Sequence, residues 1–213
     1  MKNKHTHILW DFNGTIYNDV DASRKATNVL LCEMGLNPIE TVQQLKEKFC
    51  FPVKDYYSLL GFDYSQKSYE DIAMKWTSLY NEFSESSTIM DGVEDVIKAL
   101  NEQGYIQSVV SACENNLLKM KLSSLGLSEF FEKIEGTRDS NAHSKIQIAL
   151  DWKRHNPDAV AVVIGDTEHD YEVASAIGAD CILYSGGFVS EERLQRIGCP
   201  VIRDFDEIWA YIK

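Results

Sequence analysis

Six consecutive apolar residues, from Ala159 to Ile164, place the tightest constraint on the fold of this chain. An unbroken apolar run of this length is typical of a β-strand that is covered on both faces. Apolar residues at helical spacing come before it, over 143–155, and after it, in a segment that ends at Gly178. Strands that alternate with helices in this way predict a parallel sheet with right-handed crossovers. We therefore expect an α/β fold with a Rossmann-like, three-layer core.

A second region has a different pattern. Residues 21–86 are helical in spacing and contain no convincing strand. The expected helix starts are Asp21, Asn37 with Pro38 at the first helical position, and Ser68. We predict that residues 1–18 and 89–213 form the core and that residues 19–88 form an all-helical cap, inserted after the first strand. Within the cap, the aromatic stripe of Trp76, Tyr80 and Phe83 is interpreted as internal packing.

Composition excludes several classes of function. The net charge of −12 argues against a nucleic-acid-binding protein, which needs a basic face. The sequence has no apolar run long enough to span a membrane, and its N-terminus lacks the apolar segment of a signal peptide. The five cysteines are scattered, which favours free thiols in a reducing cytoplasm. We expect a cytoplasmic protein that binds neither nucleic acid nor membrane.

Polar side chains follow three of the expected strands. Asp11 and Asn13 come after the apolar run Ile8–Trp10, Ser111 follows the strand expected at 105–110, and Asp166 follows Ala159–Ile164. The carboxyl ends of parallel strands meet at one edge of a sheet, where α/β folds bind ligands. These side chains are therefore expected to form one site.

Carboxylates dominate this expected site. If a helix begins near Asp166, then Asp170 lies on the same helical face, four residues later. Together with Asp11 they would form a set of hard oxygen ligands of the kind that Mg²⁺ prefers. Lys145 is the cation that we expect beside them, and Arg138, Lys153 and Arg154 are the alternatives.

Four motifs, in the order in which they occur along the chain, resemble those of the haloacid dehalogenase (HAD) superfamily. They are Asp11-Phe12-Asn13-Gly14-Thr15, the hydroxyl residue Ser111 after a strand, the lone Lys145, and Gly165-Asp166-Thr167 with Asp170. The resemblance covers nearly the whole chain, and the helical insert is similar to that family's type 1 cap. The likeness is greatest to phosphoglycolate-phosphatase-like members.

The resemblance implies a role for each residue of the site. Asp11 would be the nucleophile, and an aspartyl-phosphate would form on it. The resemblance implies that Mg²⁺ is held by the Asp11 carboxylate, the backbone carbonyl of Asn13 and the Asp166 carboxylate, with Asp170 orienting the neighbouring groups. It further implies that the Ser111 hydroxyl, the Ala112 amide and Lys145 bind or neutralise the phosphoryl group.

Asn13 departs from the pattern of the family. Phosphatases of this family usually carry Asp here as general acid and base, a contribution typically worth ~10²–10⁴-fold. The chain is therefore expected to be a Mg²⁺-dependent phosphatase of a small phosphorylated metabolite that is slow or needs a good leaving group. The alternative is a catalytically weak protein that binds phosphate esters. Asn13 argues against a phosphomutase, and the Asp166/Asp170 pair argues against a dehalogenase.

Overall fold

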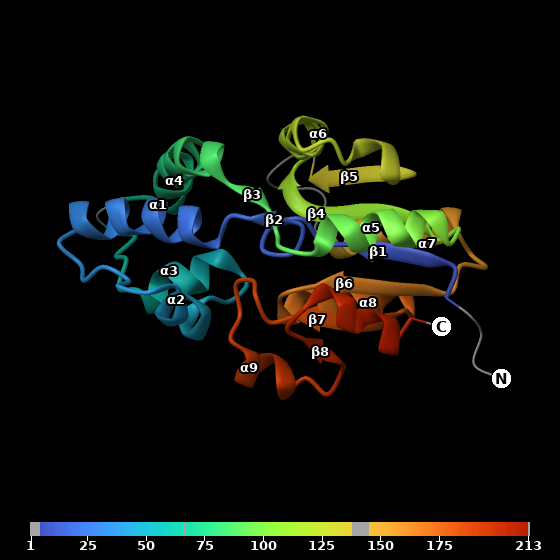
Figure 1. The fold of residues 1–213 in the computed structure, drawn as a ribbon. Coiled ribbons are helices and arrows are strands. Elements are labelled where there is room, and N and C mark those ends of the chain that lie inside the picture. The colour runs from blue at the N-terminus through green and yellow to red at the C-terminus, as the bar shows by residue number, and fades with distance from the viewer. Residues whose placement is uncertain (1–4, 66, 138–144, 213) are drawn as a thin grey trace.

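The computed structural model describes residues 5–65, 67–137 and 145–212. Its centre is a six-stranded sheet in the order β5-β4-β1-β6-β7-β8, and every neighbouring pair of strands is parallel. Helices cover both faces of this sheet (Figure 1), so the expected α/β fold is confirmed. The strands are β1 (His7–Trp10), β4 (Ile106–Glu114), β5 (Lys133–Thr137), β6 (Ala161–Gly165), β7 (Asp180–Tyr184) and β8 (Val201–Ile202).

The first strand is also the central one. His7 in β1 is paired with Ile106 of β4 on one side and with Ala161 of β6 on the other. From β1 the chain builds outward through β4 to β5, then returns and builds in the opposite direction from β6 to β8. The connections therefore diverge at the carboxyl ends of β1 and β6, which is where open α/β sheets form their ligand crevice.

The helices of the core divide into two layers. On one face of the sheet, α5 (Val93–Glu102) and α6 (Asn115–Ser124) pack against Ile8 and Trp10. On the other face, α7 (Lys145–His155) and α8 (Glu168–Ile177) pack in the same apolar cluster as Leu9. This alternation of neighbouring strand residues between two apolar clusters explains why the strands are apolar throughout. The short helix α9 (Glu191–Gln195) and a 3₁₀ turn (Phe205–Ala210) follow near the C-terminus.

Four further helices lie together at one end of the sheet (Figure 1). They sit in the chain between β2 (Tyr17–Asn18) and β3 (Thr88–Ile89), which pair with each other antiparallel. The second of these short strands, β3, was not expected from the sequence. No helix among the described residues is long and apolar enough to cross a membrane. The four helices are α1 (Val20–Glu33), α2 (Val42–Lys48), α3 (Val53–Leu59) and α4 (Tyr69–Phe83).

Two of the expected helix starts are wrong. The signal at Asn37 does not begin a helix, because the Asn28 side chain binds both the backbone N–H (2.7 Å) and the carbonyl oxygen (2.9 Å) of Ile39 and holds it in a loop. Helix α2 begins after Thr41, whose hydroxyl accepts a hydrogen bond from the Gln44 N–H. Helix α1 begins one residue before Asp21, which lies in its first turn. Ser68 caps α4 as expected.

The strand expected at 105–110 is longer than its apolar pattern indicates. It continues to Glu114, with an irregularity in its pairing with β5 between Val110 and Glu114. Helix α6 begins only at Asn115, capped by the Glu114 carboxylate. Ala112 therefore lies inside β4, three residues before α6 begins. Ser128–Phe130 form a 3₁₀ turn, and β5 begins after it, at Lys133.

One buried side chain links three elements of the core. The Gln107 amide accepts from Trp10 Nε1 at 2.9 Å and donates to the Ile97 carbonyl oxygen at 2.9 Å. We expect Gln107→Ala to lower the free energy of unfolding by about 1–3 kcal/mol, because it leaves the buried Trp10 Nε1 without its hydrogen-bond acceptor. Urea denaturation would measure this against Gln103→Ala, a change at an exposed position. Equal stabilities of the two variants would contradict the role given to Gln107.

Candidate active site

Three carboxylates converge at the carboxyl ends of β1 and β6. Asp11 follows β1, and its N–H donates to the Ile164 carbonyl oxygen of β6 at 2.8 Å. Asp166 follows β6, and Asp170 lies in the first turn of α8. One carboxylate oxygen from each of the three lies within 4.8 Å of the others, and all three residues are buried. The structure therefore brings together the three residues that the sequence placed in one site.

Asp170 is fixed by the start of α8. Its Oδ2 accepts hydrogen bonds from the N–H groups of Asp166 (3.1 Å) and Thr167 (3.0 Å) and from the Thr167 hydroxyl (2.8 Å). Thr167 and Asp170 thus form a capping box, which satisfies backbone donors at the helix start. The other oxygen, Oδ1, is left to bind Lys145.

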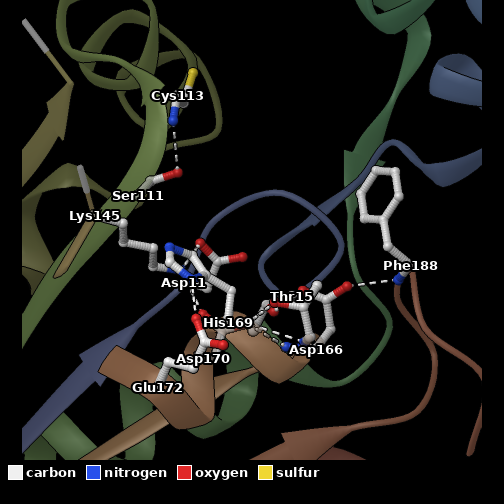
Figure 2. Close-up of polar contacts among 11 residues, drawn as sticks. Asp11, Thr15, Ser111, Cys113, Lys145, Asp166, His169, Asp170, Glu172 and Phe188 are labelled. Carbon is white, nitrogen blue, oxygen red and sulfur yellow. Dashed lines mark hydrogen bonds and ion pairs between the residues drawn. The ribbon is translucent and has the colours of Figure 1, made fainter. Parts of the chain in front are cut away.

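Lys145 connects two of the carboxylates. It is the first residue of α7, and its Nζ lies 2.5 Å from Oδ1 of Asp11 and 2.5 Å from Oδ1 of Asp170. Figure 2 shows the three side chains meeting from three different elements. Two of the alternatives are engaged elsewhere, since Lys153 donates to the Ala159 carbonyl oxygen and Arg154 pairs with Asp151. Arg138 lies outside the described residues.

Burial and mutual repulsion set the protonation of the site. Burial raises the pKa of Asp11 to about 6, although Lys145 opposes this shift. Burial and the neighbouring carboxylates raise the pKa of Asp166 well above its usual value. Burial also opposes ionisation of Asp170, but the charge and hydrogen bond of Lys145 lower its pKa overall. Burial disfavours the charge of Lys145, yet the two carboxylates raise its pKa.

Asp166 is held in place by the first motif and by the loop after β7. Its Oδ1 accepts from the Thr15 hydroxyl at 3.1 Å, and its Oδ2 accepts from the Phe188 N–H at 2.5 Å (Figure 2). Gly14 adopts a φ of +73°, and a Cβ added there would lie 2.5 Å from Oδ2 of Asp166. A glycine is therefore required beside this carboxylate, both for its backbone conformation and for space.

The donor set suits a divalent cation. Three buried carboxylates share one described lysine, so the cluster carries an excess of negative charge when all three are ionised. Carboxylate oxygens are hard ligands, and a bound divalent cation favours their ionised forms. Asp11 and Asp166 keep carboxylate oxygens near a common point, so these residues fit the Mg²⁺ that the resemblance implies.

Asn13 has partners that the sequence did not reveal. Its Nδ2 donates to Oδ2 of Asp19 (2.7 Å) and to the Tyr80 hydroxyl (2.8 Å), while the Tyr80 hydroxyl donates to the same Asp19 oxygen (2.5 Å). The other Asp19 oxygen accepts from the Gly14 N–H at 2.9 Å. Because the amide nitrogen is committed to these bonds, Asn13 offers the site an acceptor oxygen and no acidic proton.

Asp19 and Tyr80 are the polar residues that sequence reasoning missed. Asp19 is buried, and burial raises its pKa although Tyr80, Asn13 and Gly14 hydrogen-bond to it. The spacing between Asp19 and Asn13 did not indicate that their side chains would hydrogen-bond to each other. Tyr80 belongs to the aromatic stripe that was interpreted as internal packing of the cap. Its ring stacks on the ring of Trp76, which agrees with that interpretation. Both rings nevertheless line the cavity that contains the site.

This cavity has a volume of about 460 Å³ and includes Asp11, Asn13, Lys145 and Asp166 in its lining. Ser111 and Ala112 also line it. The Ser111 Oγ accepts from the Cys113 N–H at 3.1 Å (Figure 2), a local bond that fixes the hydroxyl in the irregular part of β4. All the residues that the sequence assigned to the site except Asp170 therefore border one space, and Asp170 reaches it through Lys145.

Comparison with known proteins agrees with this geometry. A pyrophosphatase, PpaX, of Listeria monocytogenes is 25% identical over 191 residues, which cover 81% of this chain and 79% of the relative. A phosphoglycolate phosphatase of Rhodobacter capsulatus is 22% identical over 190 residues, covering 85% and 84% of the two chains. The crystal structure of a predicted phosphatase from Clostridium acetobutylicum has the same fold, with a TM-score of 0.76 at 20% identity and 99% of each chain covered.

Residues 8–184 match the family of haloacid dehalogenase-like hydrolases. That match spans every motif of the site, from Asp11 to Asp170, together with β1, β4, β5, β6 and β7. The chain is a hydrolase that belongs to the haloacid dehalogenase-like family.

Proposed function

We propose that this protein is a Mg²⁺-dependent phosphatase that hydrolyses a small phosphomonoester through an aspartyl-phosphate. The observation that carries the proposal is the environment of the Asp11 carboxylate. Its Oδ1 is held by Lys145, one of its oxygens lies within 4.8 Å of Asp166 and Asp170, and it borders a cavity that can admit a small ester. The names of the two relatives, a pyrophosphatase and a phosphoglycolate phosphatase, support phosphate chemistry.

The reaction takes two displacements. In the first, the Asp11 carboxylate oxygen that does not bind Lys145 attacks the phosphorus, and the bond to the leaving oxygen breaks with its electron pair on that oxygen. In the second, water attacks the same phosphorus, and the bond to Asp11 breaks to release phosphate. Lys145 holds Asp11 in position and neutralises negative charge at the phosphoryl group.

The remaining residues hold the substrate in place. We propose that the Ser111 hydroxyl and the Ala112 amide bind phosphate oxygens, and that Asp170 positions Lys145. Asp11, the backbone carbonyl of Asn13 and Asp166 would hold Mg²⁺. The ion would offset the repulsion between the anionic nucleophile and the anionic ester.

Residues 19–88 are proposed to act as a cap over this site, with residues 1–18 and 89–213 as the core. Tyr80, on α4, supports this division because it reaches the core motif at Asn13. Closure of such a segment would exclude water from the reaction. The free state of all five cysteines is in keeping with the reducing cytoplasm expected from the sequence. The alternative of a binding protein without turnover has less support, because the matched family consists of hydrolases.

Removal of the nucleophile tests the proposal directly. We expect Asp11→Asn to lower phosphate release by at least about 1,000-fold, because an amide does not form the acyl phosphate. Rapid quenching of the wild-type enzyme, followed by peptide mass spectrometry, should find a phosphoryl group on Asp11. The control is Asp158→Asn, at an exposed position, which should keep full activity. Unchanged phosphate release by Asp11→Asn would contradict the mechanism.

Because residue 13 carries an amide and not an acid, we predict that the rate of hydrolysis depends strongly on the leaving group. Wild type should release 4-nitrophenol, which leaves without a proton, far faster than an alkyl alcohol from the matching esters. Asn13→Asp should narrow this difference by about 10–100-fold, because it restores a general acid. The new carboxyl group would lie against Asp19, so the pair would share a proton and the pKa of one member would rise.

The double change Asn13→Asp with Asp19→Asn is the matched control, since it removes the repulsion between the two carboxylates. Peptide mass spectrometry must accompany the assay, because deamidation at Asn13-Gly14 would produce the same aspartate in wild type. A difference between the two esters that is the same in all three proteins would disprove the role given to Asn13.

Metal binding can be measured without turnover. Mg²⁺ should raise the melting temperature of wild type, since a ligand at 100 times its Kd stabilises by about 2.7 kcal/mol. Asp166→Asn should abolish this shift, because it removes one anionic ligand of the proposed set, whereas Asp158→Asn should keep it. Differential scanning calorimetry with and without a chelator gives the measurement. A full Mg²⁺ shift in Asp166→Asn would rule out the proposed ligands.

A further inference from the structure

Aromatic rings make up a large part of the lining of this cavity. Seven Phe, Tyr and Trp rings contribute to its lining; they come from α3 and the segment before it, from α4 and from the loop after β7. We define these rings as the aromatic chamber: Phe49, Phe51, Tyr56, Tyr57, Trp76, Tyr80 and Phe188. We propose that the chamber receives an uncharged, planar leaving group, so that the preferred substrates are aryl phosphates or esters of similarly apolar alcohols. This inference rests on the proposed phosphatase function and names its substrate class.

The polar edges of two of these rings are already engaged. Trp76 Nε1 donates to the Thr27 hydroxyl at 3.1 Å, and the Tyr80 hydroxyl donates to Asp19 at 2.5 Å. The two rings stack on each other with centroids 4.8 Å apart and an angle of 10° between their planes. Because their donors are used, these rings offer a leaving group carbon surface, which favours an apolar or aromatic partner.

Other rings of the chamber also contact one another. Phe49 lies 4.9 Å from Phe188 and 5.2 Å from Tyr56, measured between ring centroids. Phe51 lies 5.1 Å from the His169 ring, which also borders the cavity. The Phe188 backbone N–H binds Asp166, so this wall adjoins the carboxylate cluster directly. A phosphate at Asp11 would therefore place its leaving group against the rings.

The charges around the chamber oppose an anionic leaving group. Lys145 is the one lysine or arginine among the described lining residues, and Asp11 and Asp170 already bind it. The acidic residues Asp19 and Glu114 also border the cavity. Lys121 is close to Tyr80, but it binds the Tyr17 hydroxyl and Ser84 and does not line the cavity.

A second carboxylate or phosphate on the substrate would therefore lose hydration without gaining the charge of a further lysine or arginine from the lining residues that the structure describes, which is costly in an apolar site. The two relatives are named for substrates whose leaving groups, phosphate from pyrophosphate and glycolate from phosphoglycolate, are both anionic. The chamber thus assigns to this chain a substrate class different from those that the relatives' names suggest.

The test compares esters whose leaving groups are all phenols of similar acidity, which separates fit in the chamber from leaving-group chemistry. The substrates are phenyl, 2-naphthyl and 3-carboxyphenyl phosphate, assayed with Mg²⁺, with pyrophosphate and phosphoglycolate alongside. We expect kcat/KM for the naphthyl ester to exceed that for the phenyl ester roughly tenfold, through added apolar contact. The carboxyphenyl ester should be roughly 100-fold poorer than the phenyl ester.

A charge placed in the chamber should alter this preference. Phe51 lines the cavity but is 42% exposed, so Phe51→Arg adds a cation without burying it. We expect this variant to raise kcat/KM for the carboxyphenyl ester relative to the phenyl ester by roughly tenfold. Leu59→Arg is the matched control, because Leu59 is 68% exposed on the neighbouring helix α3 and does not line the cavity. It should leave the ratio unchanged.

The outcomes separate the two proposals. Faster hydrolysis of the carboxyphenyl ester, pyrophosphate or phosphoglycolate than of the naphthyl ester would overturn the aryl preference and leave the phosphatase function standing. Failure to release phosphate from any ester would overturn the phosphatase function. In that case calorimetry with Asp11→Asn decides on the chamber, since tighter binding of naphthyl than of carboxyphenyl phosphate supports it and the reverse order disproves it.

Discussion

The structure depends on a balance of charge between one lysine and three carboxylates. Burying any of these groups alone would be costly, because an unpaired charge loses its hydration. Lys145 lies within 2.5 Å of two of the carboxylates, and its position at the start of α7 fixes where that helix meets the sheet. No lysine among the described residues forms an ion pair with the third, Asp166, which is held by the Thr15 hydroxyl and the Phe188 N–H. Three carboxylates thus share the charge of Lys145, so the cluster is suited to bind an additional cation.

The sequence predicted those parts of the fold that depend on repeating local patterns. The sheet, its helices and the meeting of Asp11 with Asp166 followed from apolar strands that end in carboxylates, because parallel strands share an edge. Helix starts were predicted where the capping residue acts on its own helix, as at Ser68. The prediction failed at Asn37, because the side chain of Asn28, in another helix, determines the conformation of that loop.

The same limit applied within the site. The carboxylates and Lys145 were found because each belongs to a motif at the end of a strand or beside one. Asp19 and Tyr80 were missed, since their importance lies in contacts between separate segments, and no spacing in the chain encodes them. The extension of β4 to Glu114 was missed for a related reason, because pairing with β5 continues past the end of the apolar run. Ala112 consequently lies inside β4, three residues before α6 begins.

The hydrogen bonds around residue 13 also explain how an amide is accommodated where the resemblance to the family led us to expect an acid. An aspartate at this position would face the Asp19 carboxylate, whereas the amide nitrogen satisfies both Asp19 and the Tyr80 hydroxyl. Residues 13 and 19 thus form a complementary pair, one amide and one carboxylate, and a change in either alters the requirements on the other. The identity of residue 13 is therefore inseparable from the packing of α4 against the core.

Asp170 illustrates a wider consequence of the capping box at α8. One of its oxygens orients the lysine of the site while the other begins a helix that covers the sheet. A homologue that had lost its hydrolytic activity would therefore still need this carboxylate. Without it, the hydrogen bonds at the start of α8 would be lost. If such an aspartate is retained in distantly related proteins, the requirement of folding explains its retention as well as the requirement of catalysis does.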